Sequence, residues 1–85
     1  MPTREHRGYE LQVYTNDHDP PHVHVFTPSG GEVRVLLLDD GTAEYWDHVP
    51  PSLKRIEVRR ALGAAEALAD ELLRIWKEIH GKTSR

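Results

Sequence analysis

The sequence contains no cysteine and no long apolar run. Without cysteine, a disulfide scaffold, a thiolate metal site and a cysteine nucleophile are all excluded. No apolar stretch approaches the roughly 18 residues that a membrane span needs. The first ten residues also lack the apolar core of a signal peptide, so we expect a cytoplasmic protein without a membrane partner.

The chain is also short, at 85 residues, which fits one small domain over residues 1–85 with a radius of gyration of about 12 Å. A domain of this size has little surplus stability, and association into a homo-oligomer is a common supplement.

The formal net charge of −3 hides an uneven distribution. Residues 1–48 carry nine acidic and three basic side chains, a net charge of −6, whereas residues 49–85 carry five acidic and eight basic ones, a net charge of +3. Five of the six histidines lie in the acidic half. This combination indicates a cation site or a pH-sensitive surface, and it argues against direct binding of nucleic acid through the phosphate backbone.

Apolar and polar residues alternate in the first half of the chain and follow a helical stripe in the second. We therefore expect an α+β fold with a three- to four-stranded antiparallel sheet over about residues 9–46. One long C-terminal amphipathic helix, over about residues 52–80, would pack on one face of that sheet. Ser52 is a candidate N-cap. Leu53 and Ile56 lie off the apolar stripe, which predicts a bend, a change of packing partner or a separate turn near residues 56–58.

Alternation along the strand at residues 22–26 places Val23 and Val25 toward the helix. His22 and His24 then point to the uncovered face of the sheet. Other side chains are expected to join them there: Gln12, Tyr14, Arg34, Leu36 and Leu38. An exposed patch of this kind indicates a partner, and we predict a partner-binding surface formed by Tyr14, His22, His24 and Arg34. Tyr45 and Trp46 form either a partner contact or part of the core at an edge strand, and we favour the core. Trp76, at helical spacing, is assigned to the core.

The most distinctive segment is Asp17-His18-Asp19-Pro20-Pro21-His22-Val23-His24-Val25, in which the histidines are spaced H-x3-H-x-H. On a strand, His22 and His24 would lie roughly 6.8 Å apart on one side, which suits two imidazoles on one ion. The predicted metal ligands are His18, His22, His24 and Asp17, and the ion would be zinc or another divalent transition metal. His18 joins only if the Asp19–Pro21 segment turns back, since an extended segment leaves it roughly 12 Å away. The alternative is that these histidines are ordinary surface or interface residues, solvated or packed against an aromatic ring.

A catalytic alternative also exists, because His22 or His24 is suited to general acid–base chemistry with Tyr14 or Arg34 stabilising charge, as in a small ribonuclease. The acidic half argues against affinity for RNA. We therefore favour a non-enzymatic role and assign no catalytic residue.

Several segments together resemble the bacterial family called domain of unknown function 4160, over about residues 8–81. They are Gly8-Tyr9, Asn16-Asp17, Pro20-Pro21-His22-Val23-His24-Val25, Glu71-Leu72-Leu73 and Trp76-Lys77-Glu78-Ile79-His80-Gly81. The resemblance implies a small cytoplasmic prokaryotic protein, encoded beside another short protein in the manner of a toxin–antitoxin pair, and it implies no activity. Three hypotheses result: a module that binds a small protein partner, a divalent-metal protein, and a small metal- or histidine-dependent nuclease toxin.

Overall fold

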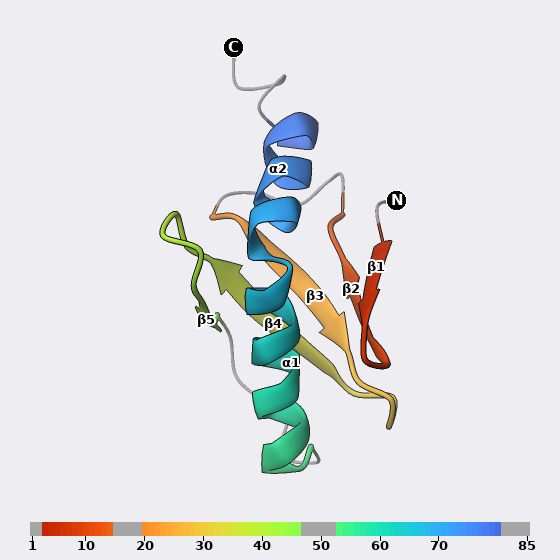
Figure 1. Ribbon diagram of the computed structural model, residues 1–85. Coiled ribbons are helices and arrows are strands. Elements are labelled where there is room, and N and C mark those ends of the chain that lie inside the picture. The colour runs from red at the N-terminus through yellow and green to blue at the C-terminus, as the bar shows by residue number, and fades with distance from the viewer. Residues whose placement is uncertain (1–2, 15–19, 47–52, 81–85) are drawn as a thin grey trace.

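The computed structural model describes residues 3–14, 20–46 and 53–80. Within these ranges the chain forms an antiparallel sheet and two helices (Figure 1). The elements are β1 (Thr3–His6), β2 (Tyr9–Gln12), β3 (His22–Phe26), β4 (Glu32–Leu37), β5 (Ala43–Tyr45), α1 (Arg55–Ala67) and α2 (Ala69–His80). The α+β class is confirmed, but the described residues contain five strands and two helices where three to four strands and one helix were predicted.

The five strands follow one another across the sheet in chain order, each antiparallel to the last. The additional strand is β1, which pairs with β2 through a tight turn at Arg7 and Gly8. Its four residues are polar and largely exposed, so they show none of the alternation by which a half-buried strand is recognised. Pairing with β2, rather than burial of side chains, holds this edge strand in place.

The C-terminal half forms two helices because the helical backbone is interrupted at Leu68, whose φ of −111° and ψ of 15° are not helical. A bend or separate turn near residues 56–58 is not formed, because residues 55–67 make one helix. Ile56 lies off the apolar stripe because its side chain is 47% exposed on that helix. Helix α1 begins after Lys54, which makes no side-chain cap hydrogen bond, and the predicted N-cap Ser52 lies outside the described residues.

Both helices lie across the same face of the sheet (Figure 1). The core forms between them from alternate strand residues and small helix residues. Its most deeply buried strand side chains are Leu11, Val13, Val23, Val25 and Val35. The helices contribute Ala61, Ala64, Ala65, Leu72 and Trp76, whose burial confirms the predicted stripe and the core assignment of Trp76. Alanines on α1 let the helix approach the sheet closely.

The segment Asp39-Asp40-Gly41 has the sequence of a hairpin turn, and it forms the turn between β4 and β5. Gly41 adopts a φ of +88°, which glycine accommodates without strain. Asp40 accepts hydrogen bonds from the backbone N–H and the hydroxyl of Thr42, at 3.0 and 2.6 Å. The radius of gyration is 12.2 Å. Among the helices described, none is long and apolar enough to span a membrane.

Candidate functional site

The histidine-bearing face of the sheet is the face that neither helix covers. We call it the histidine face, and strand register assigns its members: Glu5, Glu10, Gln12, His22, His24, Phe26, Glu32, Arg34, Leu36, Glu44 and Trp46. Gln12, His24 and Arg34 stand directly opposite one another on β2, β3 and β4. Strand register thus places both histidines on the face opposite Val23 and Val25, as the alternation in the sequence predicts. At the end of the sheet, the His22 ring also reaches Trp76 of α2.

His22 is the first residue of β3 and lies at the end of the sheet, in contact with rings from two other segments. Its ring centroid is 4.2 Å from that of Trp46 and 5.2 Å from that of Trp76 on α2. Nδ1 lies 2.9 Å from the carbonyl oxygen of Pro20. A carbonyl oxygen can only accept, so Nδ1 carries the proton in this hydrogen bond. In the neutral imidazole, Nε2 is then the basic nitrogen.

His24 lies between an aromatic ring and a carboxylate. Its ring centroid is 4.3 Å from that of Tyr14 and 5.3 Å from that of His22. Nδ1 lies 2.7 Å from a carboxylate oxygen of Glu32. This contact was not anticipated from the sequence, although the turn between β3 and β4 places Glu32 diagonally across from His24, within reach of a long side chain.

The expectation that both histidines are exposed on an open face is wrong. His22 is 3% exposed and His24 is 8% exposed. The ring contacts instead bear out the alternative in which the histidines pack against aromatic side chains. In the structure, aromatic rings packed against the imidazoles contribute to their burial. Tyr14, Leu36 and Leu38 are half-buried, so the exposed apolar patch predicted for them is also smaller than expected.

Trp46 carries the exposed aromatic surface of the histidine face. Its ring is assigned to the core by sequence reasoning, but the residue is 37% exposed, next to Tyr45 at 38%. The guanidinium carbon of Arg34 lies 5.9 Å from the ring centroid of Trp46, within the range of a cation–π contact. Trp46 also donates its backbone N–H to the carbonyl oxygen of Arg34, at 3.1 Å. The Arg34–Trp46 pair is therefore an exposed part of this face, and the Trp46 ring lies against that of the buried His22.

A row of carboxylates borders this pair on the same face. Glu5 stands opposite Glu10 on the neighbouring strand, and Phe26 separates Glu10 from Glu32 in the same row. All three glutamates are exposed. Like charges placed directly opposite on neighbouring strands are destabilising. The row therefore gives this edge of the histidine face an acidic character.

The predicted metal ligands are only partly brought together. His22 and His24 are neighbours on one face, whereas His18 and Asp17 lie outside the described residues. Among residues 3–14, 20–46 and 53–80, no group of three or more metal-ligating side chains converges. The small exposed fractions of the two histidines also leave little surface for a general base to reach a substrate, as it must to within hydrogen-bond distance.

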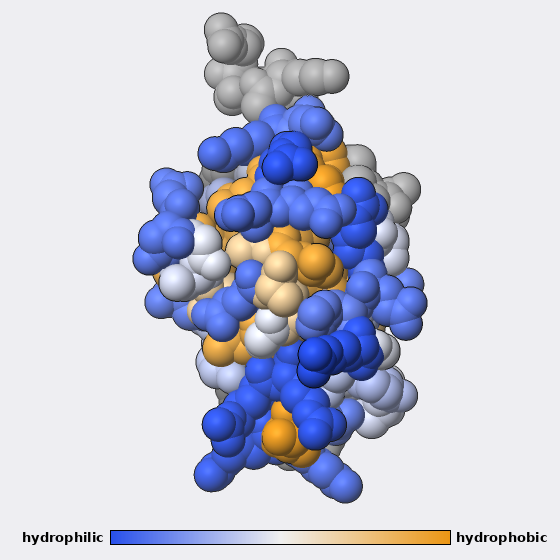
Figure 2. Space-filling view, viewed as in Figure 1, coloured by the Kyte–Doolittle hydropathy of each residue, from blue (hydrophilic) through white to orange (hydrophobic). Residues whose placement is uncertain are grey.

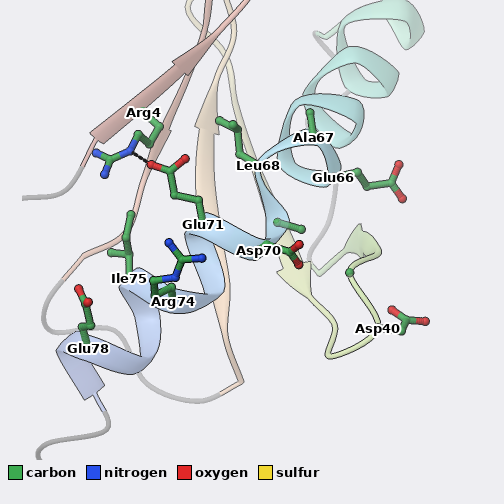
Figure 3. A pocket seen from close by; sticks show the side chains of 12 residues that line it. Arg4, Asp40, Glu66, Ala67, Leu68, Asp70, Glu71, Arg74, Ile75 and Glu78 are labelled. Atoms are coloured by element: carbon green, nitrogen blue, oxygen red, sulfur yellow. Dashed lines mark hydrogen bonds and ion pairs between the residues drawn. The ribbon is translucent and has the colours of Figure 1, made fainter.

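A separate hollow of about 680 Å³ lies where the two helices meet, and none of its lining residues belongs to the histidine face. Figure 3 shows Arg4 of β1 paired with Glu71 of α2 at one side of this hollow, and Asp40 at the other. The remaining carboxylates in it are Glu66, Asp70 and Glu78. The Arg4–Glu71 pair links the edge strand to α2, which gives the hollow a structural role.

The fold and the histidine face define a small α+β chain in which a strand bearing two histidines is lined by aromatic rings. The chain belongs to the family described as Domain of unknown function (DUF4160), whose family model matches residues 8–77. The match spans β2 through most of α2 and confirms the resemblance seen in the sequence. No curated protein and no solved structure shows significant similarity to this chain.

Proposed function

We propose that this protein is a binding module that uses its histidine face to hold a small protein partner, as one component of a two-protein pair of the toxin–antitoxin type. The observation that carries the proposal is the exposed Arg34–Trp46 pair on a sheet face that neither helix covers. Tryptophan and arginine are the residues most enriched among those that dominate binding energy at protein interfaces.

The geometry beneath the pair supports the same role. Trp46 rests on the buried ring of His22, so its side chain is held from below while its outer part stays accessible. A side chain that is ordered before binding loses less conformational entropy when it is covered. The histidines therefore act as the support of the binding surface, and Trp46 and Arg34 make its contacts.

The charge of the face indicates a basic partner. Glu5, Glu10 and Glu32 form the acidic row beside Arg34 and Trp46, and Glu44 is exposed on the same face. The repulsion between Glu5 and Glu10 is relieved when a cationic side chain lies over them. A partner with Lys or Arg beside an apolar or aromatic anchor matches both parts of the surface.

The test uses the short protein encoded beside this one, with affinities measured by calorimetry on purified proteins. Trp46→Ala is expected to weaken binding at least about 30-fold, as truncation of a dominant interface residue does. Tyr45→Ala is the matched control, since Tyr45 is equally exposed but points to the other side of the sheet. Equal losses in both variants, or no binding by the wild-type protein, would contradict the proposal.

The ionic part of the interface is tested separately with Glu5→Lys. This change reverses a charge that makes no ion pair with a described residue, and it removes the repulsion with Glu10. We expect weaker partner binding, a smaller dependence of affinity on salt, and a slightly more stable protein. Unchanged affinity across 50 to 500 mM salt would remove the acidic row from the interface.

A divalent metal held by His22 and His24 is the second candidate, favoured by one observation. Both imidazoles engage Nδ1 with an oxygen of the protein, a carbonyl for His22 and a carboxylate for His24. Metal-binding histidines are oriented in this way, with Nε2 toward the ion. Protein purified without a histidine tag should then contain zinc or a related metal. Its melting temperature should rise when that metal is added. Absence of both effects would exclude the metal.

A further inference from the structure

A second concave surface lies on the opposite side of the molecule from the histidine face, between the β1–β2 turn and α1. Its volume is about 410 Å³, within the range of small-molecule sites. The residues that line it are His6, Arg7, Tyr9, Arg60, Gly63 and Ala64. We call this surface the arginine cleft. Figure 2 shows that the surface over α1, which forms one wall, is mostly hydrophilic, with a hydrophobic patch near the start of the helix.

Every titratable group in the arginine cleft other than Tyr9 is basic. Arg7 and Arg60 reach it from the turn and from the helix, His6 adds an imidazole, and no carboxylate lines it. Neither guanidinium makes an ion pair or a hydrogen bond with any residue in the described part of the chain. Two arginines from different elements thus share one small space in a protein whose net charge is negative.

The backbone at Arg7 carries a conformational cost. Arg7 has a φ of +53° and Gly8 a φ of +89°, as in the two-residue hairpin turn that requires positive φ at both positions. Asparagine, aspartate and glycine are the residues that favour the first position of this turn. An arginine held in a left-handed conformation costs on the order of 1 kcal/mol or more, and such residues cluster at ligand-binding sites.

Tyr9 adds an independent observation. The residue is 5% exposed and lines the arginine cleft, yet its hydroxyl makes no hydrogen bond with any described residue. Buried polar groups in folded proteins nearly always have a partner, and tyrosine hydroxyls follow this rule. The cleft is the place where this hydroxyl can find one, from a molecule bound there.

We infer that the arginine cleft binds the phosphoryl group of a small phosphorylated molecule. The planar fork of each guanidinium matches a phosphate oxygen pair, and charge-assisted hydrogen bonds of this kind are among the strongest in proteins. The Tyr9 hydroxyl and a His6 N–H supply further donors. Gly63 has no side chain, so it keeps the helix side of the cleft open. A Cβ added at this position would meet no atom within 4 Å. The volume accommodates more than a phosphate ion, so a phosphate monoester fits the space.

The experiment titrates the full-length protein with inorganic phosphate and with phenyl phosphate, against sodium chloride at equal ionic strength, and follows backbone amides by NMR. Saturable shifts at residues 6–9 and 60–64 are expected with the phosphates and not with chloride. Tighter binding of phenyl phosphate identifies a monoester as the ligand class, and equal binding identifies free phosphate. Absence of saturable shifts with both probes overturns the inference.

Matched variants separate a built site from general electrostatic attraction. Arg60→Gln should weaken phosphate binding about 10-fold or more, whereas Arg59→Gln, with the same charge change one residue away and outside the cleft, should leave it within about 2-fold. Equal losses in the two variants overturn the inference.

Arg7→Asn distinguishes loss of the binding site from loss of folding, because the two would change the melting temperature in opposite directions. Asparagine suits the left-handed turn position, so this variant should melt at a higher temperature while binding phosphate more weakly. Tyr9→Phe should remain folded and lose part of the affinity. Retention of wild-type affinity by both variants overturns the inference.

Discussion

At the scale of single residues, the two histidines of β3 differ in what their Nδ1 atoms contact. His22 donates to a backbone carbonyl that belongs to the Pro20-Pro21 segment, whereas His24 meets the carboxylate of Glu32. The first contact depends only on the chain nearby, and the second depends on strand pairing. The proline pair therefore does more than start the strand, because its carbonyl also fixes which nitrogen of His22 is protonated.

Asp40 gives a pH-dependent prediction at this scale. Hydrogen bonds from the hydroxyl and the backbone N–H of Thr42 hold the pKa of the Asp40 carboxyl below its usual value. A carboxyl whose pKa is lower in the folded chain stabilises the fold above its ordinary pKa, and this stabilisation disappears as the pH falls through the folded-state value. Thr42→Ala should raise the pKa of Asp40 toward the ordinary value, measured by NMR titration of the carboxyl carbon.

Thr42→Ser serves as the control, because serine keeps the hydroxyl that donates to Asp40. Its titration curve should match that of the wild-type protein. If the alanine variant titrates at the same pH as the wild type, the hydroxyl hydrogen bond does not set the pKa of this carboxyl.

At the scale of elements, the two helices differ in the size of the side chains that form their apolar stripes. The stripe on α1 is built largely from alanines, and that on α2 from Leu72, Leu73 and Trp76. Small side chains bring α1 close to the sheet, whereas larger ones fill the greater space under α2. The interruption of the helical backbone at Leu68 lies between the alanine-rich stripe of α1 and the larger side chains of α2.

Gly63 provides the prediction for α1. It lies on the exposed side of the helix, and a Cβ added there meets no atom within 4 Å. Because glycine loses more backbone entropy than alanine in a helix, Gly63→Ala should raise the free energy of unfolding by about 0.5–1 kcal/mol. Urea denaturation followed by circular dichroism measures the change.

Gly30→Ala is the contrasting variant. Its Cβ also meets no atom within 4 Å, but Gly30 has a φ of +97°, which an alanine adopts only with strain. The two substitutions should therefore change stability in opposite directions. Stabilisation by both would mean that the turn between β3 and β4 relaxes to another conformation.

At the scale of the whole molecule, one sheet separates two different surfaces. The helix-covered side holds the core, and the histidine face holds polar and aromatic side chains that pack against one another, with Trp76 of α2 also in contact with His22. The proposed partner-binding surface and the arginine cleft therefore lie on opposite sides of the same sheet. Occupation of one leaves the other accessible.

Leu11 tests how much of the stability this core supplies. It lies on β2, is fully buried, and packs in the cluster between sheet and helices. Leu11→Ala should lower the free energy of unfolding by about 2–5 kcal/mol, because it removes apolar contacts and leaves a cavity. That loss is a large share of the roughly 4–13 kcal/mol expected for a chain of this length. Glu44→Ala, an exposed change on the histidine face, should alter stability by less than about 0.5 kcal/mol in the same urea assay.

The candidate site could be predicted only in part from the chain. Alternation correctly placed Gln12, His24 and Arg34 on one face, because side chains of a paired strand alternate with a period of two. Trp46 was misplaced in the core because its exposure depends on what packs beside a short edge strand. Glu32 was missed as the partner of His24 because that contact depends on the register of the β3–β4 pair.

The sequence by itself determined the α+β class, the helix stripe that includes Trp76, the turn at Gly41 and the family to which the chain belongs. Each of these follows from short-range periodicity, turn chemistry or a local motif. Only the tertiary structure decided the burial of the two histidines and the exposure of Trp46. It also brought Arg7 and Arg60, 53 residues apart in the chain, into one cleft. Burial and convergence are properties of surfaces that pack together, and no single segment of the chain contains the surface that will cover it.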